Sequence, residues 1–399
     1  MTQEIKLLIV SDMHVEEGKD PDSVKESWLS TSMLQQSDRK HPIEAFIEKI
    51  KSLHANFDYL INLGDVTNRG YQEGWVLGMY MLQNVKHETK VKEIVHIVGN
   101  HDICIDKDTT GKPLKQRKTD HLLRHTNNYP LKHAESNTSF WADGFCVYKS
   151  DNVLFLICNS EKDLIKTANL SDPCVFEDEY LNKIDNELKK FDGENLVRIA
   201  LMHRHIIQHS DIFNNPNQND TIVNGDKFID MIKRHNFAVV IHGHKHIARI
   251  KTDCGIPVLA SGSFASRQNV LEDNGDNLFH IVTIHWHDQN YINGFVDSYR
   301  YNNHEGWVSI PKEHSFPSHV GFGLKKSTFQ FASEIRQQYG TLLDNKEFIP
   351  IDDVIKRFPE YLYMTEEEST SFLQELEKLG YTIAIFGSKS ETKLSKMIE

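Results

Sequence analysis

The chain has 399 residues, of which 39% are hydrophobic and 26% charged, a composition typical of a globular protein with a sizeable core. Its formal net charge of −12 argues against broad, non-specific binding to duplex nucleic acid, which depends on basic surface. The five cysteines are scattered without a Cys-x-x-Cys pair, so we expect no disulfide framework and predict a cytoplasmic location. No apolar run approaches the roughly 18 residues that span a bilayer, so no membrane contact is expected.

The first hundred residues alternate short apolar runs with amphipathic segments. Strands are predicted over residues 5–10, 59–63 and 93–98, and helices over 42–50 and 73–85. Such alternation predicts a mostly parallel sheet with helices on its faces.

Residues 105–140 break this rhythm and are predicted to form an inserted loop or cap. Its basic residues are Lys112, Lys115, Arg117, Lys118 and Arg124. These basic residues leave a local nucleic-acid-binding groove as an alternative, although a solvent-exposed loop is the simpler explanation of the charge.

The rest of the chain is predicted to complete the core and to add an appendage. The expected strands and helices cover residues 145–148, 153–157, 177–191 (helix), 197–202, 226–235 (helix), 238–241, 259–264 and 280–284. We predict a catalytic domain over 1–310, a linker over 311–327 and a small accessory domain over 328–399, with a capped helix after Thr365 and a strand over 381–386. The accessory domain could be winged-helix-like, and could mediate assembly.

Histidine and acidic side chains recur just after the predicted strands. They lie in Asp12-Met13-His14, Gly64-Asp65, Gly99-Asn100-His101-Asp102, Met202-His203-Arg204-His205 and Gly243-His244-Lys245-His246. Parallel strands bring their following loops to one edge of a sheet, so these groups should meet there. Mixed imidazole, carboxylate and carboxamide ligands suit Mn, Fe, Co, Ni or Zn. Asp65 is the natural bridging anion between two such ions.

This ordered set resembles the calcineurin-like metallophosphoesterase superfamily, in its phosphodiesterase-type branch, over roughly residues 5–300. The resemblance implies a four-layer α-β-β-α sandwich, to which we add a small C-terminal α+β appendage. It implies two divalent ions, with manganese favoured. One ion would be held by Asp12, His14, Asp65 and His246, and the other by Asp65, Asn100, His203 and His244. His101 would protonate the leaving oxygen, and Asp102 would orient the His101 ring.

Several points stay open at this stage. His205 could replace His203 as a ligand, and Arg69 and Asn68 are candidate substrate contacts. The expected reaction is hydrolysis of a phosphodiester, the substrate a nucleotide or cyclic nucleotide. The alternatives are a nuclease acting on DNA or RNA ends, a phosphomonoesterase, and a catalytically silent metal-binding scaffold.

Overall fold

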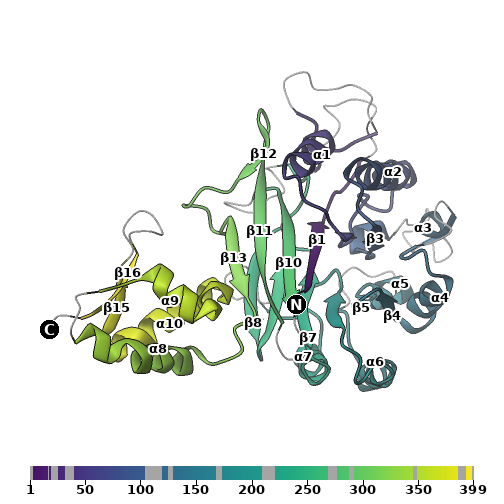
Figure 1. Ribbon diagram of the computed structural model, residues 1–399. Helices are drawn as coiled ribbons and strands as arrows, with labels where there is room; N and C mark the ends of the chain where they lie inside the picture. The colour runs from purple at the N-terminus through teal and green to yellow at the C-terminus, as the bar shows by residue number, and fades with distance from the viewer. Residues whose placement is uncertain are drawn as a thin grey trace.

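The computed structural model describes residues 3–16, 18, 26–31, 40–103, 119–124, 129–167, 173–208, 221–267, 276–286, 292–344, 348–384 and 392–397. Two mixed sheets form its centre, with helices α1 and α2 on one side and α6 and α7 on the other (Figure 1). The predicted four-layer α-β-β-α sandwich is therefore confirmed.

The first sheet carries the strands of residues 3–96 and of residues 278–322. Its order is β12–β11–β10–β1–β2–β3, and β13 pairs with β11. β1 is parallel to β2, and β2 to β3, whereas β10 joins β1 in antiparallel fashion. The bounds are β1 Gln3–Val10, β2 Tyr59–Asn62, β3 Glu93–His96, β10 Leu278–Trp286, β11 Ile292–Asn302, β12 Gly306–Ser309 and β13 His319–Phe322.

The second sheet has the order β4–β5–β6–β7–β9–β8. Its four inner strands are parallel, and an antiparallel strand closes each edge. The bounds are β4 Phe145–Ser150, β5 Val153–Cys158, β6 Val197–Leu201, β7 Phe237–His242, β8 Arg249–Asp253 and β9 Ile256–Ala260. The strands predicted over residues 145–148, 153–157, 197–202 and 238–241 are thus confirmed.

The side chains of β5 explain the layering. All six of its residues are buried. Phe155 and Ile157 belong to the apolar cluster that includes the first sheet, α1 and α2. Leu154 and Leu156 point the other way, into the cluster with α6 and α7. Alternation along a strand buries both faces, so this sheet needs a layer on each side.

Most helices lie where amphipathic patterns predict them. The buried hydrophobic residues of α1 and α2 belong to one apolar cluster and those of α6 and α7 to the other, so the two pairs of helices lie on opposite faces of the double sheet. The bounds are α1 Pro42–Ser52, α2 Gln72–Thr89, α3 Asp120–Arg124, α4 Ala134–Asp143, α5 Lys162–Thr167, α6 Asp178–Lys189 and α7 Gly225–Arg234. Among the described residues, no helix combines the length and the apolar character that crossing a bilayer requires.

The region expected to form a cap is described only in part. α3 lies within residues 105–140 and α4 begins there, and the two helices pack near α2 and β4, respectively (Figure 1). Lys112, Lys115, Arg117 and Lys118 lie outside the described residues, as does the side chain of Arg124. A basic groove in this region therefore stays a prediction.

Strand β13 lies inside the range predicted to be a linker, residues 311–327. It pairs with β11 and buries Val320 and Phe322, so the first sheet continues beyond residue 310. The frequent proline and glycine residues led to the prediction of a linker. Val320 and Phe322 are nevertheless enough for an edge strand, because β11 provides the hydrogen-bonding partner.

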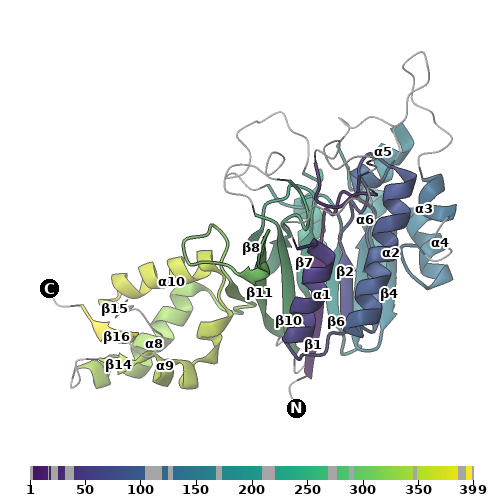
Figure 2. The same cartoon turned by 90° about the horizontal axis from the view of Figure 1, so that it is seen from above.

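The C-terminal unit has its own core and lies beside the double sheet, next to β8 and β11 (Figure 2). Its elements are α8 Thr328–Leu343, β14 Ile349–Pro350, α9 Ile351–Arg357, η3 Pro359–Tyr363, α10 Glu366–Lys378, β15 Tyr381–Ala384 and β16 Lys393–Lys396. Thr365 caps α10 in a reciprocal capping box with Glu368, as the sequence predicts. Tyr363 packs against Phe295 of β11, with ring centroids 5.0 Å apart.

Candidate metal centre

The predicted ligand loops meet at the carboxyl ends of the parallel strands. Backbone bonds join the first two loops: Asp12 N–H donates to Gly64 O (3.1 Å), and His14 N–H to Asp65 O (2.9 Å). In the second sheet, Gly243 N–H donates to the carbonyl of His203 (3.0 Å). The parallel pairing of β1 with β2 and of β6 with β7 therefore brings together residues that lie far apart in the sequence.

Glycine is required where these loops touch. A Cβ on Gly99 would lie 2.2 Å from Asp65 Oδ1, and one on Gly243 would lie 2.1 Å from Ser11 Oγ. Side chains at either position would push the ligand loops apart.

The backbone of the site is strained. Five non-glycine residues have positive φ, at 53° for Asp12, 48° for His14, 53° for Asp65, 87° for His244 and 61° for His246. Such conformations are uncommon for residues with a Cβ and cluster at functional sites. The fold holds these side chains in directions that an unconstrained chain would avoid.

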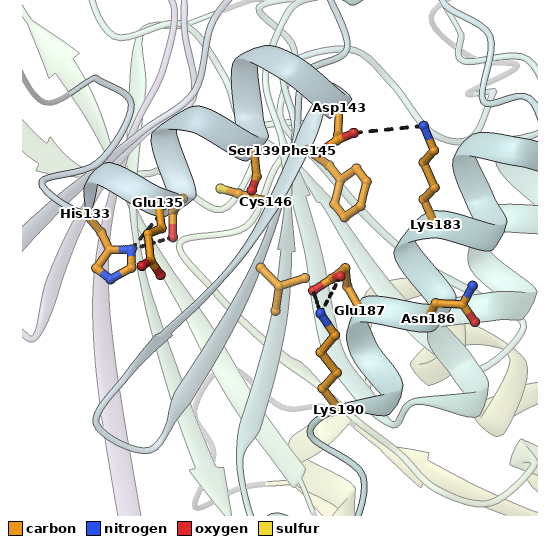
Figure 3. A pocket seen from close by; sticks show the side chains of 12 residues that line it. His133, Glu135, Ser139, Asp143, Phe145, Cys146, Lys183, Asn186, Glu187 and Lys190 are labelled. Carbon is orange, nitrogen blue, oxygen red and sulfur yellow. Dashed lines mark hydrogen bonds and ion pairs between the residues drawn. The ribbon is translucent and has the colours of Figure 1, made fainter.

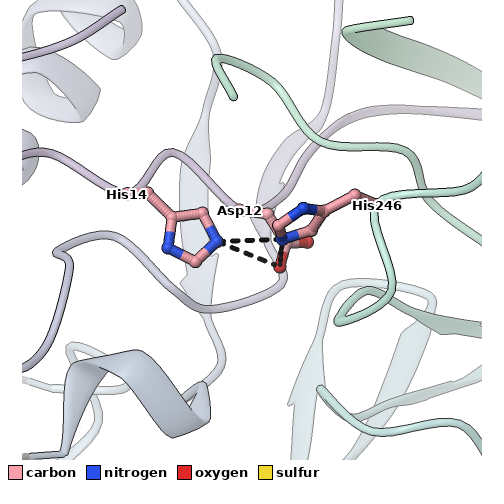
Figure 4. A group of neighbouring side chains, drawn as sticks. All are labelled: Asp12, His14 and His246. Atoms are coloured by element: carbon pink, nitrogen blue, oxygen red, sulfur yellow. Dashed lines mark hydrogen bonds and ion pairs between the residues drawn. The ribbon is translucent and has the colours of Figure 1, made fainter. Parts of the chain in front are cut away.

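The first ligand group consists of Asp12, His14 and His246 (Figure 4). His246 Nε2 lies 3.3 Å from Asp12 Oδ1 and 3.0 Å from His14 Nε2. His14 Nε2 is also 3.7 Å from Asp65 Oδ2. Ligands on one ion with bonds of about 2.1 Å are about 3.0–3.4 Å apart, so most of these spacings match a coordination shell. Asp12 Oδ1 is buried and accepts no hydrogen bond from any described residue, as expected of an oxygen reserved for a cation.

The second group is formed by Asp65, Asn100, His203 and His244. His203 Nε2 lies 3.2 Å from Asp65 Oδ2 and 3.0 Å from Asn100 Oδ1. His244 Nδ1 lies 2.8 Å from Asn100 Oδ1 and 3.3 Å from His203 Nε2. Asp65 belongs to both groups, because its Oδ2 also faces His14.

The tautomer of His203 shows why a cation fits there. His203 Nδ1 lies 2.8 Å from the carbonyl of Leu63, which can only accept, so Nδ1 carries a proton. In the neutral ring, Nε2 is then a bare lone pair facing the oxygens of Asp65 and Asn100. Three acceptors that converge in this way need a proton or a cation between them.

Without metal, a proton fills this role. Burial opposes a charge on His203, but the carboxylates of Asp65 and Asp12 outweigh it and raise the pKa of His203 to about 10. The same neighbours raise the pKa of His14 against its burial. Metal binding must displace these protons, and the residues present therefore fit a dinuclear site whose affinity rises with pH.

His101 lies beside the first group, and one of its ring nitrogens is within 4.8 Å of ligand atoms of His14 and Asp65. Its ring is edge-on to that of His14, with centroids 4.6 Å apart, and its Nδ1 lies 2.9 Å from Asn68 Oδ1. Its own backbone N–H donates to Asp65 Oδ1 (2.7 Å). Burial lowers the pKa of His101 to about 4.

The contacts of Asp102 differ from those that the family resemblance implies. Its carboxylate accepts backbone N–H groups of Gly99 (3.0 Å), Asp65 (2.9 Å) and Thr67 (3.1 Å). Asp102 therefore ties two ligand loops together, and the contact that orients His101 comes from Asn68. The expectation that Asp102 orients His101 is therefore wrong, because both carboxylate oxygens of Asp102 accept main-chain N–H groups instead. Burial and the charge of Asp65 raise the pKa of Asp102 to about 7.

The remaining sequence candidates are also placed. Arg69 is exposed over 63% of its side chain, and its Nη2 contacts Glu26 Oε1 at 2.7 Å. His205 packs against His242, with ring centroids 4.3 Å apart, while His203 presents Nε2 to Asp65. The geometry therefore favours His203 over His205 as the ligand.

A buried ion pair behind His203 was missed by the sequence analysis. Arg204 forms a two-pronged contact with Glu161, with Nε–Oε1 at 2.9 Å and Nη2–Oε2 at 2.9 Å. Ser160 Oγ accepts the backbone N–H groups of His203 (3.3 Å) and Arg204 (3.1 Å). Residues 160 and 204 are 44 positions apart, so no local pattern could have signalled the pairing.

A separate hollow of about 560 Å³ lies between α4, β4 and α6 (Figure 3). Lys183 pairs with Asp143, and Lys190 with Glu187, along its wall. None of the candidate metal ligands lines it. We therefore place the candidate metal chemistry at the carboxyl ends of the parallel strands and not in this hollow.

The family model of the calcineurin-like phosphoesterases matches residues 5–248, a range that includes every candidate ligand from Asp12 to His246. The chain belongs to the calcineurin-like phosphoesterase family. Membership supports a metal-dependent hydrolase of phosphate esters. No curated protein matches the chain.

Solved structures that resemble this chain include phosphatases. One is a dimetal phosphatase from Danio rerio, which is 13% identical with a TM-score of 0.45 over 76% of this chain and 98% of that chain. Another is the purple acid phosphatase PPD1 of yellow lupin, 12% identical with a TM-score of 0.49 over 81% of this chain and 54% of that chain. A third is phosphopantetheinyl hydrolase from Mycobacterium tuberculosis, 14% identical with a TM-score of 0.38 over 65% of this chain and 90% of that chain. At these scores the likenesses carry no argument about the substrate.

Proposed function

We propose that this protein is a dinuclear metal-dependent phosphodiesterase whose substrate is a nucleotide or cyclic nucleotide. The convergence of two ligand groups on Asp65 carries the proposal. A shared carboxylate can hold two cations at the separation of about 3.5–4 Å that hydrolysis of phosphate esters uses.

The ligands are divided as the resemblance implies. Asp12, His14, Asp65 and His246 would hold one ion, and Asp65, Asn100, His203 and His244 the other. When bound, the ions would lower the pKa of a bridging water and neutralise charge on the phosphate oxygens. Nitrogen and oxygen donors suit Mn, Fe, Co, Ni or Zn, and manganese is our first choice.

His101 is proposed as the proton donor to the leaving oxygen. Its Nδ1 is held by Asn68, which leaves Nε2 to exchange a proton with the substrate. Because burial lowers the pKa of His101 to about 4, the free site contains the neutral ring. The negative charge of a bound phosphodiester favours the protonated ring, and the imidazolium then donates from Nε2.

The charge around Asn68 supports a diester over a monoester. Glu16 and Glu26 both contact Asn68, and Glu26 also neutralises Arg69. A phosphodiester carries one negative charge, whereas a phosphomonoester approaches two at neutral pH. This acidic rim disfavours the more highly charged ester. Asn68 and Arg69 are retained as proposed substrate neighbours.

The proposal is tested with metal-free protein reconstituted with Mn²⁺. Elemental analysis should find about two ions per chain, as a two-metal site requires. Turnover of bis-p-nitrophenyl phosphate should exceed that of p-nitrophenyl phosphate at least roughly tenfold, which corresponds to about 1.4 kcal/mol of transition-state preference. The reverse ratio would rule out the diesterase proposal.

The same preparation identifies the substrate class. Cyclic nucleotides, dinucleotides and single-stranded or duplex oligonucleotides should be compared under identical metal loading. Preferred cleavage of the oligonucleotides would replace the nucleotide proposal with a nuclease. Stoichiometric metal without turnover of any ester would indicate a silent scaffold.

A further inference from the structure

Residues 26–31 cross over the loops that carry the candidate ligands. Ser27 Oγ donates to Met13 O (2.8 Å), and Trp28 N–H donates to Ala265 O (2.8 Å). Ser27 and Leu29 are buried, whereas Glu26 and Trp28 are half-buried. The carboxylate of Glu26 faces Asn68, whose Nδ2 lies 2.7 Å from Glu26 Oε2.

The amide of Asn68 has one orientation that satisfies its neighbours. Its Nδ2 lies 2.7 Å from Glu26 Oε2 and 3.2 Å from Glu16 Oε1. Ionised carboxylates only accept hydrogen bonds, so the NH₂ group must face them. Asn68 Oδ1 is thereby directed at His101 Nδ1, 2.9 Å away.

This orientation determines the proton positions on His101. An amide oxygen only accepts, so Nδ1 of His101 carries a proton and Nε2 faces the site. The chain of hydrogen bonds from Glu26 through Asn68 therefore holds the His101 ring by its Nδ1. A reversed Asn68 would present its NH₂ group to Nδ1, and this hydrogen bond from Nδ1–H would be lost.

Glu26 is itself held in place. Glu16 Oε1 accepts its backbone N–H (2.9 Å), and Arg69 Nη2 contacts Glu26 Oε1 (2.7 Å). Burial opposes its ionisation, but the hydrogen bond from Asn68 and the charge of Arg69 outweigh burial and lower the pKa of Glu26. The carboxylate is therefore ionised and acts only as an acceptor.

We propose that Glu26 is a positioning residue that acts through Asn68 to hold the His101 ring by its Nδ1–H, so that Nε2 can protonate the leaving oxygen. The proton on Nε2 passes to that oxygen as its bond to phosphorus breaks, and His101 is left neutral with its proton on Nδ1. The inference rests on the proposed function, because it assigns a second residue to the proton donor of that reaction.

The first test compares leaving groups in Glu26→Ala. Protonation of a leaving group contributes roughly 10²–10⁴-fold, and matters most for poor leaving groups. We expect kcat for an alkyl leaving group to fall at least about tenfold, and kcat for p-nitrophenolate less than about threefold. Equal loss for both leaving groups, or loss confined to KM, would overturn the proposal.

Two combined variants separate positioning from general damage. Glu26→Ala should cost nothing further in a His101→Ala background, because the residue it acts through is gone. Asn68→Asp should restore the alkyl ester activity of Glu26→Ala, because both oxygens of a carboxylate accept and no orientation is needed. Additive losses, or no rescue, would count against the inference. Glu48→Ala serves as the matched control, since Glu48 is an exposed carboxylate on α1 that pairs with Lys40.

A measurement without substrate keeps the inference separable from the proposed function. In zinc-loaded protein, ¹⁵N shifts of the His101 ring should report a proton on Nδ1 in the wild type and a mixture of tautomers in Glu26→Ala. Unchanged tautomers would refute the positioning role even if the wild type is an active diesterase. Altered tautomers in a protein with no diesterase activity would instead refute the proposed function alone.

Discussion

The buried Glu161–Arg204 pair gives the sharpest stability prediction. Glu161 is fully buried and Arg204 is 3% exposed, and their contacts are 2.9–3.1 Å long. Glu161→Gln preserves the shape but leaves the guanidinium charge uncompensated in the interior. Removing one partner of a buried pair costs about 3–5 kcal/mol, against a total stability on the order of 5–15 kcal/mol. We expect this loss in the free energy of unfolding.

Urea unfolding of the metal-free proteins measures this loss. The exposed pair Lys40–Glu48 is the control, and Glu48→Gln should change stability by less than about 0.5 kcal/mol. Replacing both buried partners, as Glu161→Leu with Arg204→Met, should recover most of the loss, because no charge is left unpaired. A loss below about 1 kcal/mol in Glu161→Gln would contradict the inference that the pair is desolvated.

Asp65 serves both ligand groups, so Asp65→Asn should reduce bound metal from about two ions per chain to fewer than one in elemental analysis, and full retention would refute its shared role. Gly243→Ala places a Cβ 2.1 Å from Ser11 Oγ and should weaken metal binding roughly 10–100-fold, read from metal-dependent melting temperatures; unchanged affinity would contradict the close packing. Burial lowers the pKa of His96 and of His280 to about 3, below the unfolded value of roughly 6.5. Their contribution to the free energy of unfolding is therefore fully present above about pH 6.5 and is lost as the pH falls toward 3. Measured by urea unfolding from roughly pH 6 to 4, His280→Phe should reduce the pH dependence by up to about 1.4 kcal/mol per pH unit, and an unchanged slope would argue against a neutral buried ring.

Local sequence patterns determined most of the core. Apolar runs such as residues 5–10 and 153–157 predict strands, because a strand buried on both faces needs continuous apolar side chains. The ligand motifs were found for the same reason: each sits directly after such a run, and parallel strands deliver their loops to one edge. The strand at 319–322 escaped prediction, since its short apolar pair becomes a strand only beside β11.

The finer assignments needed the tertiary structure. The family resemblance implied Asp102 as the residue that orients His101, but backbone donors from two loops occupy Asp102, and Asn68 contacts the His101 ring. Glu26 reaches Asn68 across 42 residues, and His203 reaches Leu63 across 140. Hydrogen-bond partners at such separations are set by how the sheets pack. The sequence by itself therefore determined which atoms could bind metal, and only the packed sheets decided which groups orient them, because orientation depends on contacts that no local pattern encodes.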